Sequence, residues 1–127
     1  MYVRGIRGAT TVEENDEQQI LDATSELLQQ IIWANEIKPE DICSVFVTTT
    51  HDLTATFPAR AIRRLPGWEL VPLMHSLEIP VTPSLPRCIR LMVHVNTNKK
   101  QNEIRHVYLN EARSLRPDIS QLTNPAT

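Results

Sequence analysis

Apolar residues recur at helical spacing along the stretch that follows Asn15. The apolar stripe consists of Ile20, Leu21, Thr24, Leu27, Leu28, Ile31 and Ile32, and the opposite face carries Glu17, Asp22, Ser25, Glu26 and Gln29. Asn15, with Gln18 three residues later, predicts the start of the helix through a capping-box pattern. We therefore expect a long amphipathic helix that packs its stripe on a sheet.

Strand patterns lie on both sides of this helix. Segments 2–10, 42–50, 70–79 and 87–96 are predicted to be strands, and 104–109 is predicted to be another strand or a short helix that leads into one. In 87–96 the residues Ile89, Leu91, Val93 and Val95 point one way, and Cys88, Arg90, Met92, His94 and Asn96 point the other. Pro58 suits the first turn of a short helix over 58–65. The prolines in 80–86 predict a loop.

The first predicted strand contains two glycines, Gly5 and Gly8, on either side of Ile6 and Arg7. Glycine within a strand marks either a bulge or the close approach of another backbone or a ligand. The sequence leaves both alternatives open.

These elements predict one domain over residues 1–116, of the α+β or α/β class. Its mixed β-sheet of about five strands would be packed by one long helix and one short helix. The polar, aperiodic segment 117–127 predicts a flexible tail. Because one long helix covers only one face of the sheet, the other face, which mixes apolar residues with charges, favours burial against neighbouring subunits or a ligand.

Charge and composition narrow the range of partners. The 127 residues carry a formal net charge of −2, so no overall positive field attracts nucleic acid or a membrane surface. Arginines outnumber lysines ten to three, and a guanidinium suits carboxylate or phosphate. No signal peptide or membrane-spanning run is evident, so we expect a cytoplasmic protein. Cys43 and Cys88 are predicted to be small buried hydrophobes.

Arg90 is the most informative candidate residue because it lies in the middle of a strand, on the mixed face. A partly buried guanidinium needs an anionic partner, which is either Glu78, as a structural ion pair, or a ligand. Arg7 has a similar position in the first strand. Arg60 and either Arg63 or Arg64 share one face of the short helix, as a solvated surface or as part of a site.

Other kinds of chemistry find little support in the sequence. The four histidines lack the spacing of a metal site, and no segment resembles a nucleophile elbow or a catalytic cysteine motif. Three glycines form no phosphate loop. We therefore expect neither a metal nor a cofactor, and a protein suited to binding and electrostatic stabilisation of a small polyanion.

Motifs along nearly the whole chain carry a family resemblance. They are 3–13 (VRGIRGATTVE), 56–61 (TFPARA), Gly67-Trp68 with Val71-Pro72, 88–90 (CIR), 104–109 (IRHVYL) and 115–118 (LRPD). In this order they closely resemble the small monofunctional chorismate mutases of the trimeric, mixed α/β class. The resemblance implies a homotrimer with a barrel-like core and with active sites between adjacent subunits. It implies conversion of the dianion chorismate to prephenate, for phenylalanine and tyrosine biosynthesis, by a Claisen rearrangement without a covalent intermediate or cofactor.

The same resemblance implies the central residues of the site. Arg90 would face the ether oxygen of chorismate as negative charge builds there, and Glu78 would accept the ring hydroxyl. Arg7 and Tyr108 would bind a substrate carboxylate.

Other positions are implied as the walls and the mouth of the pocket. Phe57, Ala59 and Leu115 match apolar walls of the family's site. Arg63 and Arg116 match cations at the pocket mouth, where they would attract the dianion or help to close over it.

Three implied pocket positions depart from the family pattern. Arg60 stands where lysine is common, His75 where a familiar pattern has cysteine, and Met74 where a smaller polar residue is usual. His75 would either donate to the ring hydroxyl or to Glu78, with added pH dependence, or be a tolerated substitution of little effect.

Two rival functions stay open at this point. A non-catalytic small-anion binding module on the same scaffold would keep Arg7 and Arg63 but would have little use for Arg90 opposite Glu78. A hydrolase or deaminase of related architecture would need a water-activating carboxylate or a metal cluster, for which the sequence offers no clear candidate.

Overall fold

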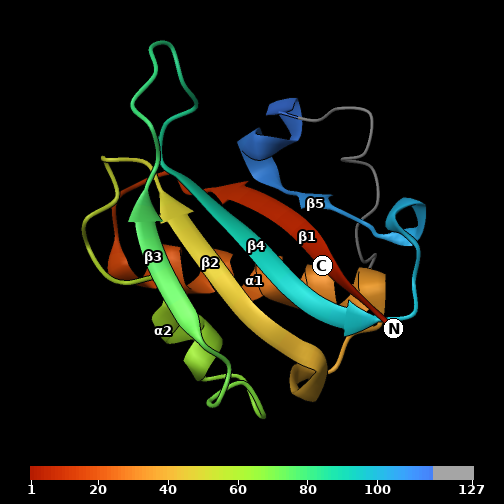
Figure 1. Ribbon diagram of the computed structural model, residues 1–127. Coiled ribbons are helices and arrows are strands. Elements are labelled where there is room, and N and C mark those ends of the chain that lie inside the picture. Colours follow the sequence, from red (N-terminus) through yellow and green to blue (C-terminus); the bar gives the residue numbers. More distant parts are fainter. Residues whose placement is uncertain (116–127) are drawn as a thin grey trace.

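Five strands form one mixed sheet in the order β3-β2-β4-β1-β5 (Figure 1). The computed structural model describes residues 1–115. Its strands are β1 (Tyr2–Thr11), β2 (Ile42–Thr49), β3 (Leu73–Leu77), β4 (Cys88–Thr97) and β5 (Val107–Tyr108). The helices are α1 (Glu17–Asn35) and α2 (Ala59–Arg63), and the short 3-10 turns are η1 (Pro39–Asp41), η2 (Gln101–Glu103) and η3 (Asn110–Leu115). The long central strand β4 runs antiparallel to β1 and β2, whereas β5 is parallel to β1 and β3 is parallel to β2.

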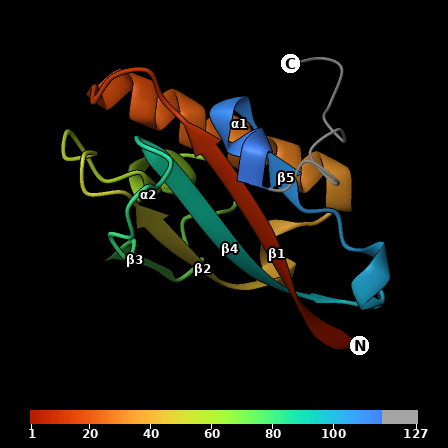
Figure 2. The same ribbon diagram turned by 90° about the horizontal axis from the view of Figure 1, so that it is seen from above.

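The helices α1 and α2 cover one face of the sheet and leave the other open (Figures 1 and 2). The predicted alternation of β4 is confirmed, because Ile89, Leu91, Val93 and Val95 are all buried in the core beneath α1. Arg90 and its same-face neighbours along β4 therefore point to the open face. The predicted class is confirmed as well: one mixed sheet of five strands with one long and one short helix.

The start of α1 differs from the prediction by one residue. Asp16, not Asn15, is the N-cap, and its carboxylate accepts a hydrogen bond from the Gln19 backbone N–H. Asn15 instead accepts hydrogen bonds from the backbone N–H groups of Thr54 and Ala55. Both side chains suit a cap, and the contact with a segment some 40 residues away decides between them.

Some predicted elements are longer than the structure shows. The helix predicted over 58–65 is only α2 (Ala59–Arg63), and the strand predicted over 70–79 is only β3 (Leu73–Leu77). β3 is an edge strand, so its length is limited by its one partner, β2.

Burial of Cys88 is confirmed, but the expected burial of Cys43 is wrong, because the register shifts at this point of β2.

Gly8 settles one of the open alternatives. A Cβ on Gly8 would come within 2.7 Å of Ile31 Cδ1 and 3.1 Å of Leu27 Cδ1, so glycine here allows α1 to pack closely on β1. Because β1 and β4 pair in continuous register, Gly8 marks no bulge, and the atoms that approach it belong to side chains of α1 rather than to another backbone. Among the residues that the structure describes, no helix has the length and apolar character needed to cross a membrane. Arg116 and the predicted tail 117–127 lie outside the described residues.

Candidate active site

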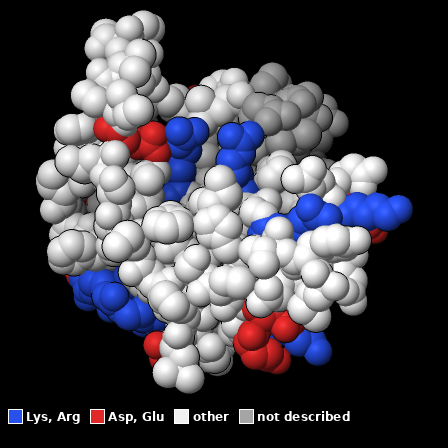
Figure 3. Space-filling model, in the orientation of Figure 1, with Lys and Arg blue, Asp and Glu red and all other residues white. Residues whose placement is uncertain are grey.

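A pocket of about 310 Å³ opens on the uncovered face of the sheet. It is lined by Arg7, Gly8, Phe46, Thr48, Glu78, Arg90, Leu91, Met92 and Tyr108. Figure 3 shows this face, which is mostly uncharged, with basic and acidic side chains next to one another in its upper part. A volume of this size is at the lower end of the range for small-molecule sites.

Strand register brings the two arginines of the pocket together. Arg7 pairs with Met92, and Ala9 pairs with Arg90, across the antiparallel β1 and β4 ladder. Residues that pair directly point to the same face, so Arg7 and Arg90 are diagonal neighbours on the open face. Two cations on adjacent strands define a place for an anion.

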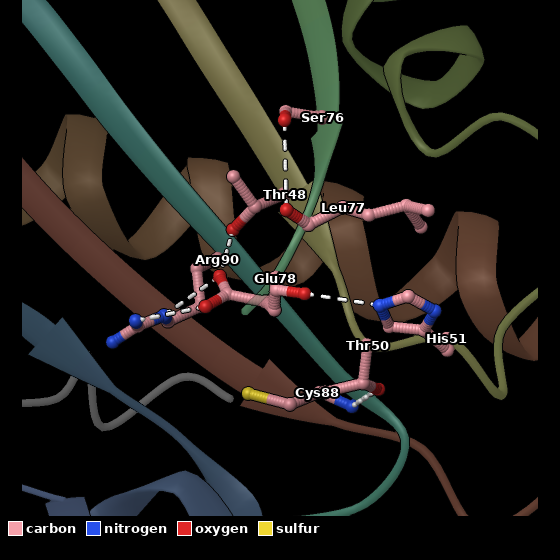
Figure 4. Close-up of polar contacts among 8 residues, drawn as sticks. All are labelled: Thr48, Thr50, His51, Ser76, Leu77, Glu78, Cys88 and Arg90. Carbon is pink, nitrogen blue, oxygen red and sulfur yellow. Dashed lines mark hydrogen bonds and ion pairs between the residues drawn. The ribbon is translucent and has the colours of Figure 1, made fainter. Parts of the chain in front are cut away.

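Arg90 and Glu78 form a two-bonded ion pair beside this pocket (Figure 4). Arg90 Nε donates to Glu78 Oε2 and Arg90 Nη2 donates to Glu78 Oε1, both at 3.0 Å. The pair lies near solvent, since the side chains are 46% and 19% exposed. The structural pairing considered from the sequence therefore exists, and it uses one edge of the guanidinium. In Figure 4 the third nitrogen points away from Glu78, so this edge remains for a ligand.

Glu78 is fixed although it lies just beyond the end of β3. Its backbone N–H donates to Thr49 O at 2.9 Å, and its carbonyl oxygen is 3.1 Å from His51 Nε2. The Thr48 hydroxyl donates to the Glu78 carboxylate. The hydrogen bonds from Arg90 keep the pKa of Glu78 below its ordinary value, Thr48 lowers it further, and partial burial opposes both. Glu78 is therefore an anion at neutral pH.

A small, largely apolar cluster meets the pocket at Tyr108. Tyr108 is 3% exposed and packs in a small cluster with Ala9 and Cys88. A second cavity of about 120 Å³ borders on Glu78 and Arg90 and is lined in part by Leu115. Cys88 lines this second cavity, and burial raises the pKa of its thiol to about 11, so it is neutral rather than a nucleophile.

The chain thus gathers five of the predicted site residues, which we call the Arg90 group. These are Arg7, Glu78, Arg90, Tyr108 and Leu115. Met74 lies on the same open face, in register with Phe46 of the pocket, and is 64% exposed. Within the described residues no three His, Cys, Asp or Glu side chains are arranged to hold a metal ion.

Four other predicted residues form a second set beside α2, which we call the His75 group. They are Phe57, Ala59, Arg63 and His75, and none of them lines the pocket of the Arg90 group. The Ala59 N–H, at the start of α2, donates to His75 Nε2 at 3.2 Å, and the rings of Phe57 and His75 are 5.4 Å apart. Successive strand residues point to opposite faces, so His75 lies on the helix side while Met74 faces outward.

Arg60 belongs to neither group. Its Nη1 donates to Glu17 Oε1 at 2.6 Å and to Thr56 Oγ1 at 2.7 Å, which ties α2 to the first turn of α1. Its guanidinium is therefore engaged within the chain.

Sequence reasoning missed Thr48, Phe46 and Met92 as pocket residues. Phe46 and Thr48 alternate with buried valines along β2, which is a signal for one shared face. Their position opposite Met92 and Arg90 depends on the register between β2 and β4, which no local pattern shows.

His75 predicts a pH dependence of stability. Burial, and then the charge of Arg63, lower the pKa of His75 below its ordinary value of 6.5. Since protonation is less favourable in the folded chain than in the unfolded one, stability is highest above pH 6.5, falls as the pH drops from 6.5 toward the lowered folded pKa, and levels off below it. We expect His75→Gln, which keeps an acceptor for the Ala59 amide but does not titrate, to flatten the melting temperature between pH 7 and about pH 5. Equal slopes for both proteins would contradict this.

Comparison with known proteins identifies relatives of this chain. A family model described as chorismate mutase type I matches residues 3–119. The chain is 49% identical over 124 residues to chorismate mutase AroH of Bacillus subtilis (strain 168), with 98% of each chain covered. It is 50% identical over 118 residues to chorismate mutase AroH of Thermus thermophilus, with 92% of this chain and 96% of the relative covered. A solved chorismate mutase from Clostridium thermocellum superimposes with a TM-score of 0.85 at 46% identity, covering 87% of this chain and 98% of the other.

Proposed function

The chain belongs to the chorismate mutase type I family, and from this premise we propose that it converts chorismate to prephenate in the pocket of the Arg90 group. In this rearrangement the ether C–O bond breaks while a new C–C bond forms, and negative charge grows on the ether oxygen. A cation fixed beside that oxygen stabilises the transition state more than the ground state, which is the condition for catalysis.

The observation that carries the proposal is the orientation of Arg90. Glu78 holds the guanidinium by its Nε–Nη2 edge, so its remaining edge is available to the developing oxyanion without reorganisation. Arg7 supplies a second cation for a substrate carboxylate, and the Tyr108 phenol supplies a hydroxyl donor. Glu78 supplies an acceptor for the ring hydroxyl.

The expected contributions to transition-state stabilisation are sufficient for catalysis without a general base. A millionfold acceleration requires about 8 kcal/mol. One well-placed donor to an oxyanion contributes about 3–4 kcal/mol, and a charged donor contributes more. Holding the flexible enolpyruvyl arm over the ring supplies the remainder, because restraint of reacting groups is worth up to about 7–11 kcal/mol.

The test is to mix the purified protein with chorismate and follow both the loss of its ultraviolet absorbance and the formation of prephenate. Catalytic turnover supports the proposal. Binding of chorismate without turnover would favour the small-anion binding module, and release of a hydrolysis product would favour a hydrolase.

We further propose that the enzyme is a cytoplasmic homotrimer, with each active site built from the Arg90 group of one subunit and the His75 group of the next. Two observations support this assembly. The His75 group contributes nothing to the pocket in its own chain. The open face exposes Phe46 and Met74, which are 44% and 64% accessible, and a contiguous apolar surface of this kind favours burial in an interface. A monomeric mass from light scattering would contradict the assembly.

Arg63 belongs to the mouth of this proposed site, and it predicts a salt dependence. It is exposed, and its partner would be a dianion near solvent. Arg63→Ala should therefore lower kcat/KM more than kcat, and the loss should shrink as ionic strength rises, because salt screens exposed charges. Steady-state kinetics in low and high salt measure this. An effect that grows with salt would rule out electrostatic attraction as the role of Arg63.

A further inference from the structure

Thr48 makes a contact with Glu78 that the proposed reaction does not by itself require. Its hydroxyl donates to the oxygen of Glu78, Oε2, that also accepts from Arg90 Nε (Figure 4). Thr48 lies on β2, where it pairs with Arg90 of the neighbouring β4 and with Ser76 of the neighbouring β3. It therefore stands between the strand that carries the cation and the strand that leads to the carboxylate.

We infer that Thr48 is a positioning residue, which holds the Glu78 carboxylate in the plane that orients the Arg90 guanidinium toward the substrate. The inference rests on the proposed function. Glu78 is the first residue after β3, at the base of the loop that projects beyond the sheet in Figure 1. The end of a glutamate side chain rotates through a broad, shallow range of angles unless it is bonded.

The physical argument is that Arg90 cannot hold Glu78 alone during catalysis. A dianion at the free edge of the guanidinium competes with Glu78 for the same positive charge. Thr48 retains the carboxylate through a hydrogen bond to an ion, which is stronger than one between neutral groups. The backbone contacts of Glu78 with Thr49 and His51 fix its main chain but leave the carboxylate free to turn.

Thr48→Val is the sharpest test, because valine keeps the shape of threonine, suits a strand and removes only the hydroxyl. We expect kcat to fall about tenfold while KM changes less than about twofold, since a hydrogen bond to a charged group is lost and no substrate contact is removed. Thr48→Ser, which keeps the hydroxyl, should restore kcat to within about twofold of the unmodified enzyme. Ser76→Ala, a hydroxyl removal in the paired strand that leaves Glu78 untouched, is the matched control and should have no effect.

A double-mutant cycle separates positioning from a direct role. If Thr48 acts through Glu78, Thr48→Val should change kcat less than about twofold when Glu78→Ala is already present. The full tenfold loss in both backgrounds, or no loss in either, would overturn the inference.

A second readout does not depend on activity. The Glu78 pKa, followed by carboxyl NMR, should rise in Thr48→Val and not in Ser76→Ala, and an unchanged value would also overturn the inference. An unmodified enzyme that never forms prephenate would instead refute the proposed function, while this measurement would still test the contact.

Discussion

Replacing Arg90 by alanine is expected to reduce kcat by about a thousandfold or more, since removal of a single oxyanion donor costs 10²–10³ in other enzymes and this donor is charged. KM should change much less, because Arg7 and Tyr108 still line the pocket and still bind the substrate. Single-turnover and steady-state assays with chorismate measure both constants. A folded Arg90→Ala protein with nearly normal turnover would show that another group stabilises the ether oxygen.

Two further variants make this result specific. Arg90→Lys keeps the positive charge, but an ammonium cannot hold Glu78 through one edge and present a second edge to the ligand. The kcat of Arg90→Lys should therefore lie between that of the unmodified enzyme and that of Arg90→Ala. Arg64→Ala removes an exposed arginine at the end of α2, outside the pocket, and should leave kcat unchanged. A large loss in Arg64→Ala would mean that net charge, rather than position, controls the rate.

The fold was predictable where one local pattern determined it. Alternation in β4 was sufficient to place Arg90 on the open face, because from Ile89 to Val95 buried residues alternate with more accessible ones. The helical stripe of α1 was equally clear, but Asn15 and Asp16 were chemically equivalent as caps, and only a contact with the distant segment at Thr54 distinguishes them. Short elements such as β5, with two residues, owe their existence to a neighbour rather than to their own sequence.

The site was predictable in part, and for a similar reason. The family resemblance pointed to Arg7, Glu78 and Arg90, which the chain does bring together. The Thr48 contact depends on the register of three strands, and register is set by packing along the whole sheet. The resemblance also assigned to one pocket residues that a single chain keeps apart, since adjacent strand positions such as Met74 and His75 face opposite ways.

Mixing two impaired proteins is expected to restore activity if the site is shared between subunits. One protein carries Arg90→Ala and the other carries Phe57→Ala with Arg63→Ala, so each lacks one group but keeps the other. Random reassembly after joint unfolding and refolding would give about a quarter of the sites two intact groups, because each site draws independently on two neighbouring subunits. The mixture should therefore recover up to about a quarter of normal activity at low chorismate, where each parent is nearly inactive.

The control for this experiment mixes two proteins damaged in the same group, Arg90→Ala and Arg7→Ala. Every site in that mixture has a defective Arg90 group, so no recovery is expected, although assembly and total protein are the same. Recovery in neither mixture would mean that each chain completes its own site. Recovery in both would mean that the subunits repair one another's folding rather than share a pocket. Only recovery confined to the first mixture agrees with a cation that comes from one subunit and a pocket mouth that comes from the next.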